Sequence, residues 1–146
     1  RVGWEVANAR AGMVKAIVTV EPGGGIDRQM LNYDPPITAV ADLKTYMEEK
    51  GEREGENDCR LQTEPVRKLA VNGLRNIPIL DISGDGGYHR AGDACPPKWI
   101  NQAGGHAEFV RLEDVGIKGN GHMMMLEKNS DVVIKFIGDW MAKNIK

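Results

Sequence analysis

Ile77-Pro-Ile-Leu-Asp-Ile-Ser83 is a short, almost continuously apolar stretch that ends abruptly in Gly84-Asp-Gly-Gly87. Its length and its isoleucines are typical of a strand covered on both faces, as in a parallel sheet. The glycines that follow favour a sharp turn. The stretch therefore predicts a buried strand of a parallel sheet, with a turn at its carboxyl end.

Working outward from this strand, apolar stretches alternate with stretches of helical character. The predicted elements in chain order are a helix at 2–9, a strand at 13–20, the strand at 77–83, a helix at 96–102 with Trp99 and Ile100 facing inward, a strand at 107–112, and a last helix that Asn129 or Ser130 can cap. Strands that alternate with helices predict an α/β fold with helices on both faces of a parallel sheet.

Residues 26–60 interrupt this alternation, and we interpret them as a cap-like insertion over the sheet and not as a separate domain. A short helix is expected at Asp42–Lys50, with Leu43, Tyr46 and Met47 on one side. The polar run 51–58 is most simply a solvated loop. A second short helix is expected at Glu64–Ala70.

The composition excludes some functional classes. The 146 residues carry a formal net charge of -2 with scattered Lys and Arg, so no electrostatic footprint of a nucleic-acid binder is present. The sequence contains no run of about 18 apolar residues, so no membrane-spanning helix is predicted. Cys59 and Cys95 are expected to pair in an exported protein and to be free thiols in a cytosol. Because the chain opens within a helical pattern at Arg1, we expect it to be part of a longer protein.

Chemistry is expected beyond the carboxyl ends of the parallel strands, where ligands collect in such sheets. Glu21 follows the first strand, Asp85 follows the second, and a glycine-rich loop that carries His122 follows the third. His122 is a candidate general base, and such a base needs an orienting carboxylate. Glu21 and Asp85 both qualify by position, although Glu21 could also cap a helix and Asp85 could serve a turn.

Other side chains near these strand ends have weaker claims. Tyr88 and His89 are expected to line the crevice, and Met123 either lines an acyl site or, with its neighbouring methionines, fills gaps in the core. The spacing of the histidines and cysteines matches no metal pattern, so no metal site is predicted. Neither Ser83 nor Ser130 lies in a Gly-x-Ser-x-Gly elbow, so the sequence shows no nucleophile of that kind.

Two stretches carry a resemblance to a known family. Gly3–Arg10 followed by Val14–Pro22 resembles the segment after the nucleophile elbow in a bacterial esterase group of the α/β-hydrolase superfamily. Gly116-Ile-Lys-Gly-Asn-Gly-His-Met-Met-Met-Leu-Glu-Lys-Asn-Ser130 resembles the histidine loop of that group. The similarity covers most of the chain and is weakest between residues 38 and 58.

The resemblance implies the C-terminal portion of an α/β-hydrolase domain, with an elbow serine a few residues upstream of Arg1 and both oxyanion-hole donors outside the chain. His122 matches the catalytic histidine and Glu21 the triad acid, which we prefer to Asp85. The implied activity of the longer protein is hydrolysis of a small-molecule carboxylic ester, without a cofactor. The alternatives are a non-catalytic member of the fold that binds a small molecule or a protein, or another reaction such as group transfer or peptide cleavage.

Overall fold

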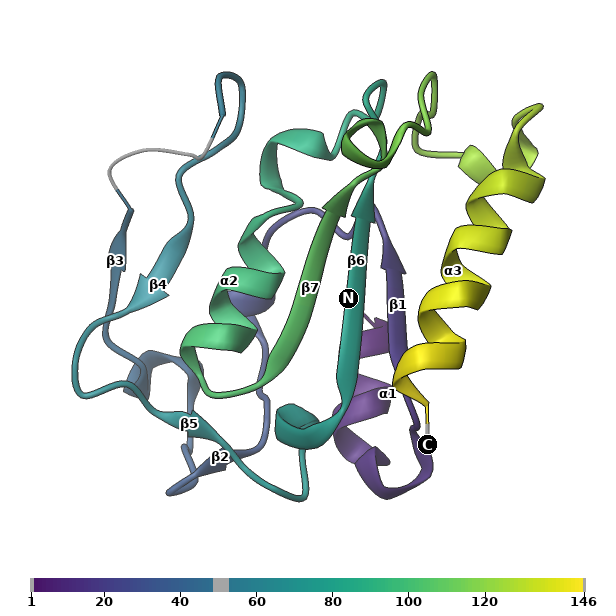
Figure 1. Cartoon of the computed structure of the whole chain (residues 1–146). Coiled ribbons are helices and arrows are strands. Elements are labelled where there is room, and N and C mark those ends of the chain that lie inside the picture. Colours follow the sequence, from purple (N-terminus) through teal and green to yellow (C-terminus); the bar gives the residue numbers. More distant parts are fainter. Residues whose placement is uncertain (1, 49–52, 146) are drawn as a thin grey trace.

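A computed structural model of the chain describes residues 2–48 and 53–145. Its centre is a three-stranded parallel sheet in the order β1-β6-β7 (Figure 1). The strands are β1 (Ile17–Val20), β6 (Pro78–Ser83) and β7 (His106–Arg111). The middle strand β6 is the apolar stretch that predicted the sheet, and it pairs in parallel with both neighbours. The predicted parallel sheet is confirmed.

Three helices cover the two faces of this sheet: α1 (Val2–Ala9), α2 (Cys95–Gln102) and α3 (Ser130–Asn144). Successive side chains of a strand point to opposite faces. Ile79 of β6 belongs to a core with Trp99 of α2. Leu80, one residue later, belongs to a second core with Trp140 of α3. Helices therefore lie on both faces, as predicted, and Trp99 and Ile100 are fully buried.

Four short strands form two antiparallel pairs beside the main sheet (Figure 1). They are β2 (Tyr33–Asp34) with β5 (Lys68–Leu69), and β3 (Thr45–Met47) with β4 (Arg60–Gln62). The pairs β2–β5 and β3–β4 join segments within 26–60 to segments after it. That residues 26–60 form a cap-like insertion over the sheet stays a prediction.

The helix expected at Asp42–Lys50 is wrong for the part that is described. A 3₁₀ turn at Val40–Asp42 is followed by strand β3, and Lys50 lies outside the described residues. The Asp42 carboxylate accepts hydrogen bonds from the backbone N–H groups of Thr38 and Ala39, so it closes a turn that precedes it instead of starting a helix. Tyr46 and Met47 are exposed, and only Leu43 is buried.

The helix expected at Glu64–Ala70 is also wrong, because β5 occupies part of this segment. The Gln62 side chain accepts a hydrogen bond from the N–H of Arg67 and donates one to its carbonyl, which holds the chain extended. Leu69 then pairs with Tyr33 and is fully buried. Pairing and burial therefore override the local helix preference.

Two smaller expectations also change. The first strand begins at Ile17 and not at Met13, because Ala11–Met13 forms a 3₁₀ turn and Met13 is exposed. The polar run 51–58 is not wholly solvated where it is described: the Glu56 side chain is 3% exposed and lies 2.6 Å from Arg111 Nε at the end of β7. Residues 51 and 52 lie outside the described part.

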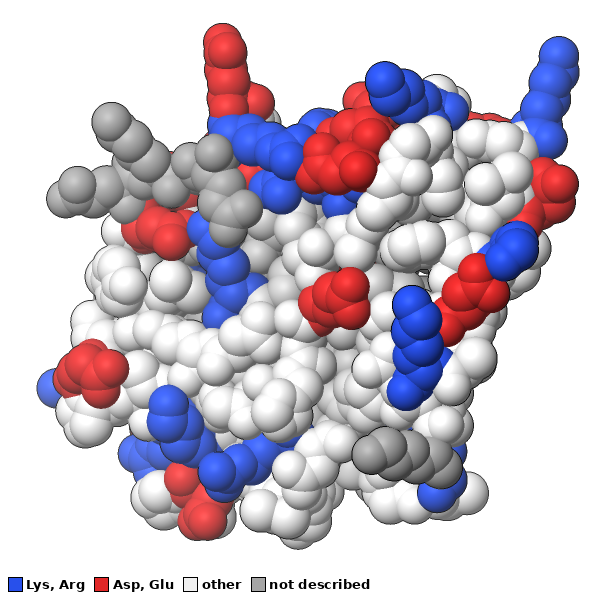
Figure 2. Space-filling model, in the orientation of Figure 1, with Lys and Arg blue, Asp and Glu red and all other residues white. Residues whose placement is uncertain are grey.

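Cys59 and Cys95 form a disulfide, with their Cα atoms 5.1 Å apart. The bond joins the segment before β4 to the first turn of α2. On the face in Figure 2, acidic and basic side chains lie next to each other in several places with uncharged surface between them, in keeping with the net charge of -2. Within the described residues, no helix is both long enough and apolar enough to cross a bilayer.

Candidate active site

Glu21 lies directly at the carboxyl end of β1. Its N–H donates to the Ile82 carbonyl at 2.8 Å, which continues the pairing with β6 by one residue. Its φ of 46° lies in the left-handed region, which is uncommon for a residue with a side chain. The Glu21 side chain is fully buried, and its Oε1 accepts a hydrogen bond from the N–H of Gly84 at 3.1 Å. The turn thus aims a carboxylate into the protein at the end of the sheet.

The space for this carboxylate depends on a glycine. A Cβ atom at Gly87 would overlap with the Glu21 carboxylate, because even Oε2, the farthest of the three carboxylate atoms, would be 2.5 Å away. A Cβ atom at Gly84 would collide with the Asn120 carbonyl. Close approach of chain segments, and not turn geometry alone, therefore explains glycine at 84 and 87.

His122 faces this carboxylate from the loop after β7. Its Nδ1 lies 3.1 Å from Glu21 Oε2, and about a third of the His122 side chain is exposed, at 32%. A carboxylate can only accept hydrogen bonds, so the neutral imidazole carries its proton on Nδ1. This tautomer leaves the Nε2 lone pair available as a base. The two residues are 101 positions apart in the sequence.

Asp85, the second candidate acid, is engaged elsewhere. Its carboxylate accepts hydrogen bonds from the N–H groups of Gly119 at 2.9 Å and Asn120 at 3.0 Å. The hydrogen bond from Gly119 is the largest cause that lowers the pKa of Asp85. Asp85 therefore anchors the start of the histidine loop, whereas the carboxylate next to the His122 ring belongs to Glu21.

A polar network fixes the other side of the histidine loop. Asn120 is fully buried and donates to Glu127 and to Asn129, at 2.6 and 2.8 Å. Glu127 also accepts the N–H of Gly121 at 2.8 Å. Asn129 occupies the N-cap position of α3, which begins at Ser130 as expected, but its side chain makes no capping hydrogen bond and instead donates to the Lys118 carbonyl. His122 is thus held between two anchored stretches of backbone.

The rings of Tyr88 and His89 pack against His122. The centroid of the Tyr88 ring lies 4.7 Å from that of His122, and the His89 centroid lies 4.8 Å from it. Tyr88 is 74% exposed, and Met123 beside His122 is 52% exposed. Tyr88 and His89 thus contact the His122 ring, and Met123 follows His122 directly in the chain. Their proposed contact with substrate stays a prediction.

Neither serine of the sequence is placed to act with His122. Ser83 is fully buried, and its hydroxyl donates to Asp93 at 2.7 Å. Ser130 begins α3. Within the described residues, no hydrogen bond joins either hydroxyl to His122. No group of three or more His, Cys, Asp or Glu side chains among these residues is arranged to hold a metal ion.

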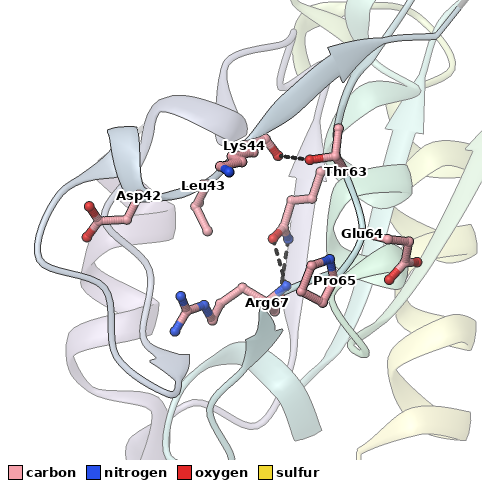
Figure 3. Close-up of a pocket in the computed structure, with 8 residues that line it drawn as sticks. Asp42, Leu43, Lys44, Thr63, Glu64, Pro65 and Arg67 are labelled. Carbon is pink, nitrogen blue, oxygen red and sulfur yellow. Dashed lines mark hydrogen bonds between the residues drawn. The ribbon is translucent and has the colours of Figure 1, made fainter.

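A separate hollow lies between the loops that flank β3, β4 and β5 (Figure 3). Its lining comprises Asp42, Leu43, Lys44, Gln62, Thr63, Glu64, Pro65 and Arg67. It shares no residue with the group around Glu21 and His122. We assign no function to this hollow.

Comparison with known proteins gives a relative whose name states a function. The chain is 32% identical to the probable secreted lipase phiG of Fungal sp. (strain ATCC 74256), over an alignment of 158 positions that covers 97% of this chain. The chain spans 43% of the length of that protein. This similarity supports a relationship to lipase-type hydrolases, and it does not bear on the bacterial esterase group. Neither a protein-family model nor a solved structure matches the chain.

Sequence reasoning placed Glu21 and the loop of His122 after two strands of the same sheet, but it missed the residues that hold them. Gly87 gives the carboxylate its space, and Asp93 and Asn120 are fully buried polar side chains beside the two loops. A signal for Asn120 was present, because it directly precedes Gly121 and His122 in the histidine loop. Nothing in the sequence around Asp93 indicates its partner 70 positions away.

Proposed function

We propose that this chain supplies the base and the acid of a carboxylic ester hydrolase with a Ser-His-Glu triad. His122 is the base, Glu21 is the acid, and the nucleophilic serine is contributed by residues upstream of Arg1 in a longer α/β-hydrolase. The observation that carries the proposal is the 3.1 Å contact between His122 Nδ1 and the buried Glu21 carboxylate at the carboxyl end of a parallel sheet.

Under this proposal, each atom of the pair has a task. Nε2 of His122 would take the proton of the serine hydroxyl as the hydroxyl attacks the ester carbonyl, and would return that proton to the leaving alcohol. Water would then hydrolyse the ester between the acyl group and the serine by the same proton transfers, which releases the carboxylic acid product. Glu21 stabilises the imidazolium that forms in between and fixes the tautomer with Nδ1–H. A carboxylate with fixed partners and no solvent exposure suits this role, because it needs no reorganisation during the reaction.

The similarity to a probable secreted lipase supports an ester as the class of substrate. The contacts of Asp85 argue against it as the acid. Its carboxylate already binds two backbone N–H groups of the histidine loop. Replacing Asp85 would therefore loosen the loop, whereas replacing Glu21 would remove the partner of the His122 ring.

Labelling with a fluorophosphonate probe tests the proposal. A protein that carries this chain together with the residues encoded upstream of Arg1 should be labelled, and His122→Ala should abolish the labelling. The 146-residue chain alone should not react. Labelling of the chain alone would contradict the proposal, and a longer protein that stays unlabelled would favour a non-catalytic binding member of the fold.

Turnover of an ester by the longer protein then identifies the acid. Glu21→Gln should lower kcat by about 10⁴, as loss of a triad acid does in serine hydrolases. Asp85→Asn keeps one oxygen acceptor for the loop and should cost far less. A larger loss for Asp85→Asn than for Glu21→Gln would overturn the assignment of Glu21.

A further inference from the structure

Asp93 is a fully buried carboxylate that the proposed chemistry does not use. It follows the 3₁₀ turn Arg90–Gly92 and lies two residues before α2, which begins at Cys95. One oxygen, Oδ1, accepts the N–H of Gly23 at 2.8 Å, and the other, Oδ2, accepts the hydroxyl of Ser83 at 2.7 Å. Asp93 therefore joins the turn after β1 to the end of β6.

The turn that Asp93 holds is the one that aims Glu21. Gly23 lies two residues after Glu21, and both have positive φ, at 64° and 46°. For Glu21 this conformation costs on the order of 1 kcal/mol, so the chain does not adopt it without support. A hydrogen bond from the Gly23 N–H to a buried carboxylate is charge-assisted and therefore among the stronger ones.

Packing around the same turn restricts it further. The His89 ring lies 3.0 Å from where a Cβ atom of Gly23 would be. The backbone of Gly92, next to Asp93, approaches Gly24 so closely that an added Cβ would lie 3.0 Å from the Gly24 nitrogen. The segment 89–93 thus forms the wall against which the turn after Glu21 rests.

We propose that Asp93 is a positioning residue for Glu21. By holding the Gly23 N–H, it fixes the left-handed turn and keeps the Glu21 carboxylate within hydrogen-bond distance of His122 Nδ1. Its effect on catalysis rests on the proposed function, but its effect on the geometry of Glu21 and His122 does not. Losing the bond should displace the carboxylate on a scale of an ångström, which costs about 100-fold in kcat where catalysis depends on position.

The test uses the imidazole nitrogens of His122, observed by two-bond ¹H–¹⁵N NMR on the 146-residue chain at a pH where the ring is neutral. The wild type should show the Nδ1–H tautomer of His122 as the main form. The Glu21→Gln variant shows the signal of His122 when its carboxylate partner is replaced, and serves as the reference. Asp93→Ala removes the acceptor of the Gly23 N–H and should abolish the predominance of the Nδ1–H form.

Two variants separate positioning from general loss of structure. Asp93→Asn keeps an oxygen for the Gly23 N–H and an amide N–H₂ that can donate to Ser83, so it should retain the wild-type tautomer. Ser83→Ala removes the second partner of Asp93 without touching the first, and should also retain it. A folded Asp93→Ala variant with an unchanged tautomer would overturn the proposal.

If Asp93→Ala does not fold, the Asp93→Asn variant tests the proposal instead, through amide hydrogen exchange at Gly23 and the tautomer of His122. Protection of the Gly23 amide and the Nδ1–H tautomer should then persist together in Asp93→Asn. Loss of the tautomer while the Gly23 amide stays protected would overturn the proposal. Because these signals do not depend on turnover, a failed labelling experiment refutes the esterase function and leaves the role of Asp93 in the geometry standing.

Discussion

Replacing Gly87 with alanine is expected to separate His122 from its carboxylate without altering either residue. The added Cβ would lie 2.5 Å from Glu21 Oε2 and closer still to the other carboxylate atoms. The φ of Gly87 lies outside the left-handed region, so alanine is not strained by its own backbone. The steric effect on Glu21 is therefore isolated.

The size of the displacement follows from contact distances. Ordinary contacts of a Cβ atom begin at 3.4 Å, so Oε1, which would lie 1.6 Å away, must retreat by about 1.8 Å, and Oε2, at 2.5 Å, by about 1 Å. Since Oε2 now lies 3.1 Å from His122 Nδ1, a retreat of this size away from the ring takes the pair beyond hydrogen-bond distance. A hydrogen bond to a charged group contributes about 1.5–3 kcal/mol, and we expect the free energy of unfolding to fall by this amount. In the longer protein, kcat should fall by about 100-fold or more.

Urea unfolding and the tautomer of His122 measure these effects in the chain itself. Gly86→Ala is the matched control, because its Cβ would meet its nearest atom, the Asn120 carbonyl oxygen, at an ordinary 3.4 Å. We expect Gly86→Ala to resemble the wild type in both measurements. If Gly87→Ala also keeps the wild-type tautomer and unfolding midpoint, the carboxylate is not held where we describe it, and the reasoning from Gly87 fails.

Three further predictions concern stability, each measured by urea unfolding. Burial raises the pKa of Asp81 well above its ordinary value. The stability that protonated Asp81 contributes is therefore complete below its unfolded-state pKa of about 3.9. Above that pH this contribution is lost by about 1.4 kcal/mol per pH unit until the folded-state pKa is reached, and Asp81→Asn should remove this slope. Replacing both Cys59 and Cys95 with alanine opens a link across 36 positions and should cost about 3–4 kcal/mol. Glu56→Gln should weaken the buried pair with Arg111 and cost about 3 kcal/mol, a loss that persists at high salt because buried pairs are little screened.

The elements that the sequence predicted correctly are those with a long apolar pattern. Strand β6 and helix α2 bury whole faces, so their residues carry a pattern that is readable without tertiary information. Strands β3 and β5 have three and two residues, too few for any periodicity. Their structure is decided by partners elsewhere in the chain, such as Leu61 for Tyr46, which no local pattern shows.

The candidate site, too, was predictable only in part from the sequence. The rule that chemistry gathers at the carboxyl ends of parallel strands brought Glu21, Asp85 and His122 forward together. It could not separate Glu21 from Asp85, because both follow a strand and both precede glycine-rich turns. The structure distinguishes them, because the Glu21 carboxylate contacts the His122 ring, whereas the Asp85 carboxylate binds the backbone of the histidine loop.

The cost of placing Glu21 is itself an argument about its role. Burying an ionised carboxylate costs several kcal/mol unless its partners are well placed, and the left-handed backbone adds on the order of 1 kcal/mol. A core position at the end of β1 would be served better by an apolar side chain with extended backbone. Instead, Gly87 leaves room for the carboxylate and the Gly84 N–H binds it, while Asp93 holds the turn that follows. Strain and buried charge that stability does not require gather at functional sites, and here they meet at the contact between Glu21 and His122, in keeping with the proposed role of Glu21.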